Sequence, residues 1–255
     1  MKNLEGKFVG IGVGPGDPEL ITIKAVKMLK MADVISVPKA HEDKPSLALA
    51  TVQHILKERE RPPELLKLVF PMTKDKDGLK RAWARNAQII AEKAKTGKII
   101  AFITLGDPMF YSTFIYLCHS MKEEFPEVKL EIIPGVTSLT ACAASSKVPL
   151  AERDEIVAII PSATDSNQIE KIAKHADNLV LMKGTQRLKD LVPILEKCGF
   201  TKNSTIALVR RCTMPEEKVI VGKLGDVPSW DFHDDYFSMT IIKSSENEPW
   251  KGEAP

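Results

Sequence analysis

The sequence is poor in several features that define whole classes of protein. Only four cysteines are present, and these are Cys118, Cys142, Cys198 and Cys212. Because they are widely spaced and form no Cys-x-x-Cys pair, we expect reduced, mostly buried thiols in a cytoplasmic protein and no zinc site. The formal net charge of +2 gives no strong electrostatic field, which argues against a nucleic-acid partner.

Long apolar runs are also missing. No segment approaches the ~20 apolar residues that cross a bilayer, so we expect no membrane partner. The first seven residues, 1–7, lack the apolar core of a secretory signal. With 255 residues, of which 44% are hydrophobic, the chain is long enough for one or two domains with sizeable cores.

A phosphate-binding glycine pattern is the third absence. The stretch 8–20 is typical of a strand, a glycine-rich turn and a helix start. In a dinucleotide pattern, Gly12 and Gly14 would need a third glycine where Asp17 stands. Asp17 is expected instead to cap the helix, in the place that a phosphate would take. Such a bare turn indicates either close approach of a ligand without phosphates or a tight strand-to-helix connection.

Strand-like and helix-like segments alternate through the chain. Further strands are predicted at 33–38, 65–70, 98–103, 128–133, 156–160, 179–182, 205–209, 218–221 and 237–242. Helices are predicted at 20–32, 47–56, 79–94, 111–124, 139–146, 168–175 and 186–198. The alternation predicts an α/β fold with a mainly parallel sheet in an N-terminal domain, 1–122. Late strands without intervening helices predict a mixed sheet in a C-terminal domain, 123–255.

The Gly-Asp-Pro of the first turn returns at Gly106-Asp107-Pro108, again after a predicted strand and before a predicted helix. We expect Asp107 to cap that helix and Pro108 to be its first residue. Helix capping is one explanation of the motif. The alternative is a ligand wall, because open α/β sheets bind ligands at the carboxyl ends of their strands.

A run of small residues at 139–146 follows Pro134-Gly135-Val136-Thr137-Ser138. A helix with such small side chains is expected to pack its backbone close against a flat surface, of which a sheet is the simplest. Three side-chain-poor motifs therefore stand in one order along the chain: Gly14-Pro15-Gly16-Asp17-Pro18, Leu105–Phe110 and Pro134–Ser138.

In these three motifs, and over most of its length, the chain resembles the tetrapyrrole methyltransferases, which use S-adenosylmethionine. Val37-Pro38-Lys39, Phe70-Pro71-Met72 and Tyr236-Phe237-Ser238 resemble the branch that methylates C20 of precorrin-2 or cobalt-factor II in corrin synthesis. The resemblance implies two unequal α/β domains of the tetrapyrrole methylase type, a cofactor in the cleft between them, and a homodimer. S-adenosylmethionine has no phosphate, in agreement with the first turn.

The resemblance also implies a set of cofactor-binding residues. These are Pro15, Gly106, Asp107, Phe110, Thr137, Ser138, Met182, Met239 and Thr240. The register at Met182 can shift to Lys183. The segment Arg210-Arg211-Cys212-Thr213 departs from the family's pattern, so no contact is assigned there.

The reaction that the resemblance implies is attack of a tetrapyrrole meso carbon on the activated methyl group, for which alignment supplies most of the catalysis. Asp107 is the first candidate for a polar catalytic role and Tyr111 the second, while a capping role alone stays open for Asp107. No resident metal is expected. His41 is either an exposed loop residue or a contact to the substrate's cobalt. The rival functions are methylation of another corrin position or of a protein, and a non-catalytic carrier of tetrapyrrole or cofactor.

Overall fold

The structure of the protein is a computed structural model. It describes residues 6–39, 45–70, 75–161, 164–184 and 187–244. The chain divides into two compact units, Met1–Thr137 and Ser138–Pro255. None of the helices in these described ranges is both long and apolar enough to cross a membrane.

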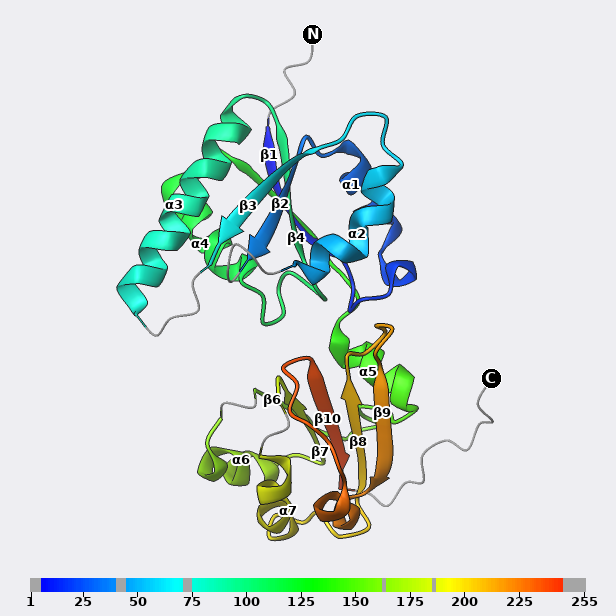
Figure 1. Ribbon diagram of the computed structural model, residues 1–255. Coiled ribbons are helices and arrows are strands. Elements are labelled where there is room, and N and C mark those ends of the chain that lie inside the picture. The colour runs from blue at the N-terminus through cyan, green and yellow to red at the C-terminus, as the bar shows by residue number, and fades with distance from the viewer. Residues whose placement is uncertain (1–5, 40–44, 71–74, 162–163, 185–186, 245–255) are drawn as a thin grey trace. The chain divides into compact units, whose positions relative to one another are not determined.

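The first unit is built on a five-stranded sheet in which every pair of neighbours is parallel (Figure 1). The strands are β1 (Lys7–Gly12), β2 (Val34–Lys39), β3 (Glu64–Val69), β4 (Ile99–Thr104) and β5 (Lys129–Ile133), in the order β3-β2-β4-β1-β5. The central strands are almost continuously apolar because helices cover both faces. The predicted parallel sheet is confirmed.

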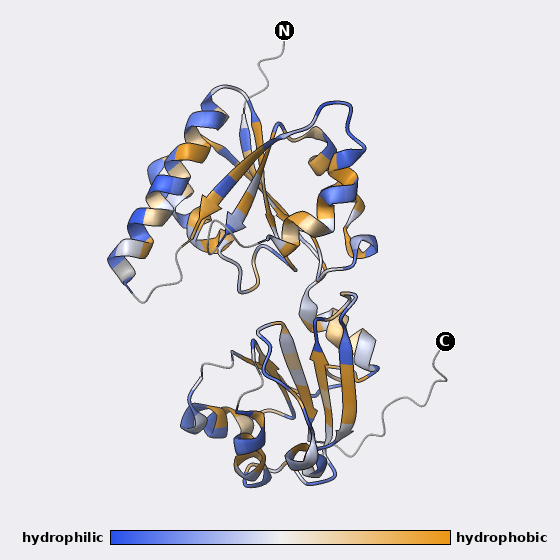
Figure 2. Ribbon diagram, in the orientation of Figure 1, coloured by the Kyte–Doolittle hydropathy of each residue, from blue (hydrophilic) through white to orange (hydrophobic). Residues whose placement is uncertain are grey.

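Four helices cover this sheet, two on each face (Figure 1). Helices α1 (Ile23–Met31) and α2 (Leu47–Lys57) pack on one face, and α3 (Lys76–Lys95) and α4 (Phe114–Glu124) pack on the other. Figure 2 shows apolar residues on the strands and polar ones along the outer side of α3. Each face therefore has its own apolar core.

The start of the first helix differs from the sequence prediction. Asp17 accepts a hydrogen bond from the Glu19 amide (2.9 Å), but the element it caps is a short 3₁₀ turn, Pro18–Leu20. Helix α1 begins later, behind Thr22, whose hydroxyl accepts from the Ala25 amide (3.2 Å). The predicted helix at 20–32 is thus a capped turn followed by a separately capped helix.

The division between the units also differs from the predicted one. The sequence interpretation starts the second domain at residue 123, before β5. The structure groups β5 with the first unit, because β5 pairs with β1 from Lys7↔Lys129 to Ile11↔Ile133. The strand completes the crossover that α4 begins, so the predicted boundary between residues 122 and 123 falls within the last turn of α4, inside the first unit.

The second unit holds a mixed five-stranded sheet, as predicted. Its strands are β6 (Val157–Pro161), β7 (Asn178–Met182), β8 (Thr205–Arg210), β9 (Lys218–Lys223) and β10 (Ser238–Lys243), in the order β6-β7-β10-β8-β9. Of these five strands, β6 and β7 pair in parallel, and the other pairs are antiparallel. Helices α6 (Ser166–Ala173) and α7 (Leu188–Glu196) cover one face. On the other face the small-residue helix α5 (Ser138–Ser146) packs against β8, β9 and β10.

A buried lysine ties the end of β10 to the loop before β6. Lys243 is only 1% exposed, and its Nζ donates to Glu155 Oε2 at 2.8 Å and to Glu152 Oε2 at 3.2 Å. Asn178 Nδ2 also donates to Glu155 Oε2, at 2.8 Å. Burial disfavours the charged form of Glu155, but the hydrogen bonds from Lys243 and Asn178 outweigh it and hold the pKa of Glu155 below its ordinary value.

This ion pair predicts acid sensitivity of the second unit. Because the folded-state pKa of Glu155 is depressed, its contribution to stability is complete above the ordinary value of 4.5 and is lost as the pH falls below it. We expect Glu155→Gln to lower the free energy of unfolding at pH 7 by about 1–3 kcal/mol and to flatten its decline on acidification. Urea unfolding between pH 7 and pH 3 measures both effects.

The matched control is Glu152→Gln, because the Glu152 side chain is 49% exposed and that of Glu155 is 19% exposed. We expect the smaller loss for Glu152→Gln. Equal losses in the two variants would contradict the stronger role assigned to Glu155.

Candidate functional site

The chain leaves two neighbouring strands of the first sheet, β1 and β4, toward opposite faces of that sheet. From β1 the chain passes to α1 on one face, whereas from β4 it passes to α4 on the opposite face. In open α/β sheets, ligands bind outside the carboxyl ends of the strands at such a divergence. The turns that follow β1 and β4 are the two Gly-Asp-Pro motifs, so both of them lie at this point.

Three turns meet there through their backbones. The Gly106 amide donates to the Gly14 carbonyl (2.7 Å), and the Val13 amide donates to the Thr104 carbonyl (2.9 Å). A Cβ on Gly12 would lie 2.5 Å from the Gly106 oxygen and 2.6 Å from the Gly135 nitrogen. Close approach of backbone to backbone therefore accounts for the bare character of these turns.

The glycine conformations in these turns have a second consequence. Gly14 and Gly106 have φ values of +79° and +67°, which side chains rarely adopt. Beside Gly106 there is open space, because a Cβ built there meets only the Cα of Thr137, at 3.9 Å. The backbone at Gly106 therefore has room for at least one further carbon atom beside it.

The prediction that Asp107 caps a helix is wrong. Helix α4 begins at Phe114, well after Asp107 and Pro108. Asp107 Oδ1 instead accepts from the Met109 amide (2.8 Å), and Oδ2 accepts from the Gly135 amide (3.0 Å). The carboxylate therefore fixes its own turn and connects it to the turn after β5.

In the loop between Asp107 and α4, the Ser112 side chain is fixed by hydrogen bonds, whereas Met109 and Tyr111 are exposed. Ser112 Oγ lies 3.0 Å from Thr104 Oγ1 and accepts from the Phe114 amide (3.2 Å). Met109 and Tyr111 are 52% and 45% exposed. Tyr111 has a positive φ of 49°, a costly conformation for a tyrosine that is found most often at functional sites.

The other cofactor-binding residues predicted in the first unit lie in or next to these turns. Pro15 follows Gly14, and the ring of Phe110 packs edge-on against that of Tyr111, with centroids 4.9 Å apart. Thr137 is the last residue of the first unit. The structure thus brings together Pro15, the pair Gly106-Asp107 and Thr137, which come from three separate parts of the sequence.

In the second unit, three predicted residues lie on adjacent strands. Met182, at the end of β7, pairs with Met239 of β10, and Thr240 pairs with Leu181. Met182, Met239 and Thr240 are all buried. Ser138 is the first residue of α5. Neither the pairing nor the burial tests whether these four residues bind a cofactor, so that assignment stays a prediction.

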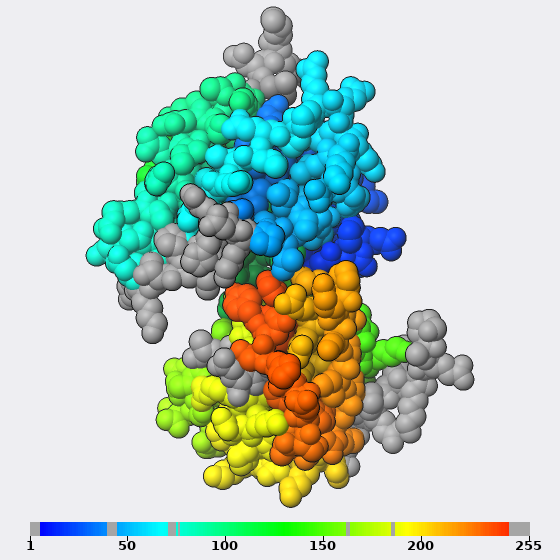
Figure 3. Space-filling view, in the orientation of Figure 1, coloured from blue at the N-terminus to red at the C-terminus, as the bar shows by residue number. Residues whose placement is uncertain are grey.

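The segment before β10 joins the turns that follow β7 and β8. Ser238 accepts from the Lys183 amide (3.0 Å) through its carbonyl and from the Gly184 amide (3.1 Å) through its hydroxyl. Arg211 Nε donates to Asp235 Oδ2 (2.7 Å). Burial opposes ionisation of Asp235, but the hydrogen bonds from Arg211 and the Phe237 amide, together with the arginine charges nearby, outweigh it and lower the pKa of Asp235. Figure 3 shows this segment, in orange-red, at the surface of the second unit.

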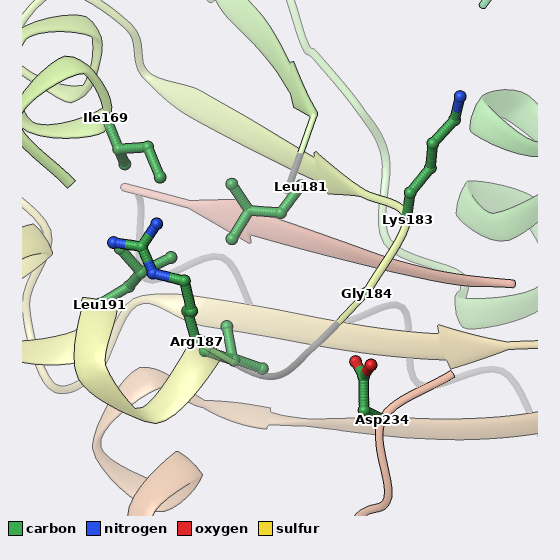
Figure 4. A pocket seen from close by; sticks show the side chains of 8 residues that line it. Ile169, Leu181, Lys183, Gly184, Arg187, Leu191 and Asp234 are labelled. Atoms are coloured by element: carbon green, nitrogen blue, oxygen red, sulfur yellow. The ribbon is translucent and has the colours of Figure 1, made fainter. Parts of the chain in front are cut away.

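A small cavity at the carboxyl end of β7 was not expected from the sequence. It has a volume of about 250 Å³, and Figure 4 shows Leu181, Ile169 and Leu191 around it with Arg187 and Asp234 at its edge. The Arg187 guanidinium donates to the Thr164 carbonyl (3.0 Å) and to the Ser166 hydroxyl. The lining comes from separate segments whose leucines and isoleucines look like ordinary core residues, so no sequence signal marks the cavity.

Two sequence predictions fall on residues that the structure does not describe. One is His41, the possible contact to the substrate's cobalt, and the other is Pro71-Met72 of the motif Phe70-Pro71-Met72. Among the residues that are described, no three His, Cys, Asp or Glu side chains are grouped so as to hold a metal ion.

The contact of the turns predicts different effects for two glycine variants. We expect Gly12→Ala to lower the free energy of unfolding by about 3 kcal/mol or more, because the new methyl group meets only backbone atoms. Gly106→Ala has room for its methyl group, so we expect only the ~1–2 kcal/mol cost of its left-handed backbone. Urea unfolding of both variants measures the difference, and equal losses would contradict the packing described here.

Comparison with known proteins gives an independent view of the chain. The family model for tetrapyrrole (corrin/porphyrin) methylases matches residues 7–228. A probable cobalt-precorrin-2 C(20)-methyltransferase of Methanocaldococcus jannaschii is 38% identical over 243 residues, which cover 95% of this chain and 98% of the relative. The cobalt-precorrin-2 C(20)-methyltransferase of Salmonella typhimurium is 34% identical over 84% of this chain and 87% of the relative.

Solved structures agree on the fold. A cobalt precorrin-4 methyltransferase has a TM-score of 0.71 at 22% identity, covering 97% of this chain and 99% of that one. The uroporphyrin-III C-methyltransferase of Thermus thermophilus, complexed with S-adenosyl homocysteine, has a TM-score of 0.65 at 22% identity, covering 93% and 97%. The predicted pair of α/β units is confirmed.

Proposed function

The chain belongs to the tetrapyrrole (corrin/porphyrin) methylases, and we propose that it methylates C20 of a precorrin-2-type tetrapyrrole in cobalamin biosynthesis. The family and the class of enzyme predicted from the three motifs are confirmed, and the cofactor of this class is S-adenosylmethionine. One observation of the structure carries the proposal. The turns after β1, β4 and β5 meet through backbone and leave open space beside Gly106.

The residues at this point fit the cofactor. A sulfonium nucleoside without phosphates needs carbonyl oxygens near its positive sulfur and amide groups near its carboxylate. Glycine turns offer both groups without side-chain bulk. We propose that Pro15, Gly106, Asp107 and Phe110 hold the cofactor from the first unit. Thr137, the last residue of that unit, is a further proposed contact. Ser138, Met182, Met239 and Thr240 are proposed contacts from the second unit.

The chemistry divides between the cofactor and the chain. When bound, S-adenosylmethionine supplies an electrophilic methyl group on a leaving thioether. The chain's contribution is alignment, because a meso carbon conjugated with ring nitrogens is already nucleophilic. Asp107 orients the turns after β4 and β5 through both of its oxygens, and its remaining lone pairs can accept the proton displaced from the substrate. Tyr111 is the second proposed catalytic residue.

The substrate proposed here contains cobalt. Two relatives above 30% identity carry the name cobalt-precorrin-2 C(20)-methyltransferase, which supports the cobalt form over metal-free precorrin-2. We further propose a cytoplasmic homodimer, on the family resemblance alone. Methylation of another corrin position, and binding without transfer, are the alternatives that the first experiment separates.

The first experiment follows a labelled methyl group. We expect purified protein to transfer the methyl of ¹³C-labelled S-adenosylmethionine to C20 of the cobalt substrate, and to do so faster than to precorrin-2. Carbon NMR of the product identifies the position. Label at another carbon would contradict the C20 assignment, and binding of cofactor without any transfer would favour the carrier.

The second experiment tests Asp107. In Asp107→Asn one carboxylate oxygen becomes an NH₂ group facing a backbone N–H, so we expect a loss of about 1–3 kcal/mol in stability. We expect cofactor affinity to persist and turnover to fall roughly 10-fold to 100-fold as the turns lose alignment. Steady-state kinetics and calorimetric cofactor binding measure these effects.

Asp17→Asn is the matched control, because Asp17 stands in the other Gly-Asp-Pro motif and accepts from the Glu19 amide of its own turn. We expect turnover of this variant to stay near that of the parent. If turnover of Asp107→Asn were unchanged, Asp107 would have no part in the mechanism beyond stability.

A further inference from the structure

Two cysteines of the second unit meet although they lie far apart in the sequence. Cys142 is on α5, and Cys212 is in the turn after β8. Their side chains interact with each other, and both residues are buried, at 2% and 6% exposure. Ser145 lies one turn of α5 beyond Cys142, with its Oγ 3.5 Å from Cys212 Sγ.

The hydrogen bonds form a chain that ends at a carboxylate. Ser145 Oγ donates to Glu217 Oε2 at 3.1 Å, so the hydroxyl oxygen can accept from the Cys212 thiol. Glu217 also accepts from the Thr213 amide, which fixes it beside the turn. A proton can therefore leave Cys212 through Ser145 to Glu217.

The two thiols differ in character. The interaction with Cys142, and a smaller one with Ser145, lower the pKa of Cys212 against the opposing effects of burial and of the nearby Glu217 carboxylate. The hydrogen bond to Cys212, and then burial, raise the pKa of Cys142. Cys212 is thus the nucleophilic member of the pair and Cys142 the neighbour that keeps its proton.

We propose that Cys142 and Cys212 are an oxidisable pair, which a peroxide converts into a disulfide. The Cys212 sulfur attacks one peroxide oxygen, the O–O bond breaks, and the departing oxygen takes up the thiol proton and leaves as water. Cys142 then attacks the resulting sulfenic acid of Cys212, the S–O bond breaks, and the hydroxyl leaves with the Cys142 proton as a second water. Two thiols and one hydrogen peroxide thus give one disulfide and two waters.

The bond joins two segments that otherwise meet only through packing and hydrogen bonds. Helix α5 begins at Ser138, and the turn after β8 holds Arg211 and Thr213 at positive φ values of 49° and 61°. Since Ser138 is a proposed cofactor contact, the thiol state is coupled to cofactor affinity. This consequence rests on the proposed function, whereas the formation of the disulfide does not.

The test maps the disulfide on protein without substrate. After treatment with hydrogen peroxide, alkylation and digestion, we expect mass spectrometry to find the peptides of Cys142 and Cys212 linked, and released by dithiothreitol. Cys118, on α4, and Cys198, whose thiol donates to the Glu170 carbonyl, should be alkylated. Alkylation of all four cysteines, or links that involve Cys118 or Cys198, would overturn the proposal.

Variants test the order of the steps. Cys142→Ser should leave a sulfenic acid on Cys212 that dimedone labels, whereas Cys212→Ser should leave Cys142 unlabelled. Ser145→Ala should slow formation of the disulfide by about tenfold, because the path to Glu217 is cut. Cys198→Ser is the matched control and should form the disulfide at the parent rate. Dimedone labelling of Cys142 in place of Cys212 would reverse the assigned roles.

Calorimetry tests the coupling to the cofactor separately. We expect the bridged and reduced forms to differ in affinity for S-adenosylhomocysteine by about fivefold or more. Equal affinities would overturn the coupling between thiol state and cofactor binding. The formation of the disulfide itself is tested separately by the peptide map. Failure of methyl transfer in the assay above would not affect the peptide map.

Discussion

The contact among three backbone turns is the constraint on which the first unit depends. Gly106 donates to Gly14, Gly12 lies against Gly135, and Asp107 accepts from Gly135. Each of these contacts needs the absence of a Cβ or the presence of one short carboxylate. The turns that follow β1, β4 and β5 therefore carry few side chains. Peptide groups form most of the surface at this end of the sheet. Such a surface suits a ligand with a sulfonium and an amino-acid end better than a nucleotide with phosphates.

Much of the fold is predictable from periodicity, because strands buried on both faces are short apolar runs and the helices between them carry clear stripes. The starts of helices were less predictable. Asp17 and Asp107 stand in the same local motif, and each accepts from the amide two residues further on, but Asp107 also accepts from the distant Gly135 amide. Local sequence is the same in both places, so only the neighbour supplied by the rest of the fold, Gly135, decides the difference.

The candidate site divides in the same way. The glycines and Asp107 could be singled out as a group from the sequence, because they form side-chain-poor turns at the ends of predicted strands. Tyr111 was also a candidate, but its strained backbone was not predictable, because a positive φ at tyrosine leaves no pattern in the sequence. The meeting of Cys142 on α5 with Cys212 after β8 leaves no pattern there either. The second unit's residues Met182 and Met239 are adjacent only because β10, the last strand, enters between β7 and β8.

The pairing of β5 with β1 also governs how the first unit is made. Strand β1 is the first of the five to be synthesised, and the edge of β1 that pairs with β5 stays unpaired until Ile133 has left the ribosome. During that interval the nascent chain exposes a row of free amide and carbonyl groups along an almost wholly apolar strand. A fragment that ends before β5 keeps this edge permanently and is prone to aggregate, whereas one that extends to Thr137 closes it.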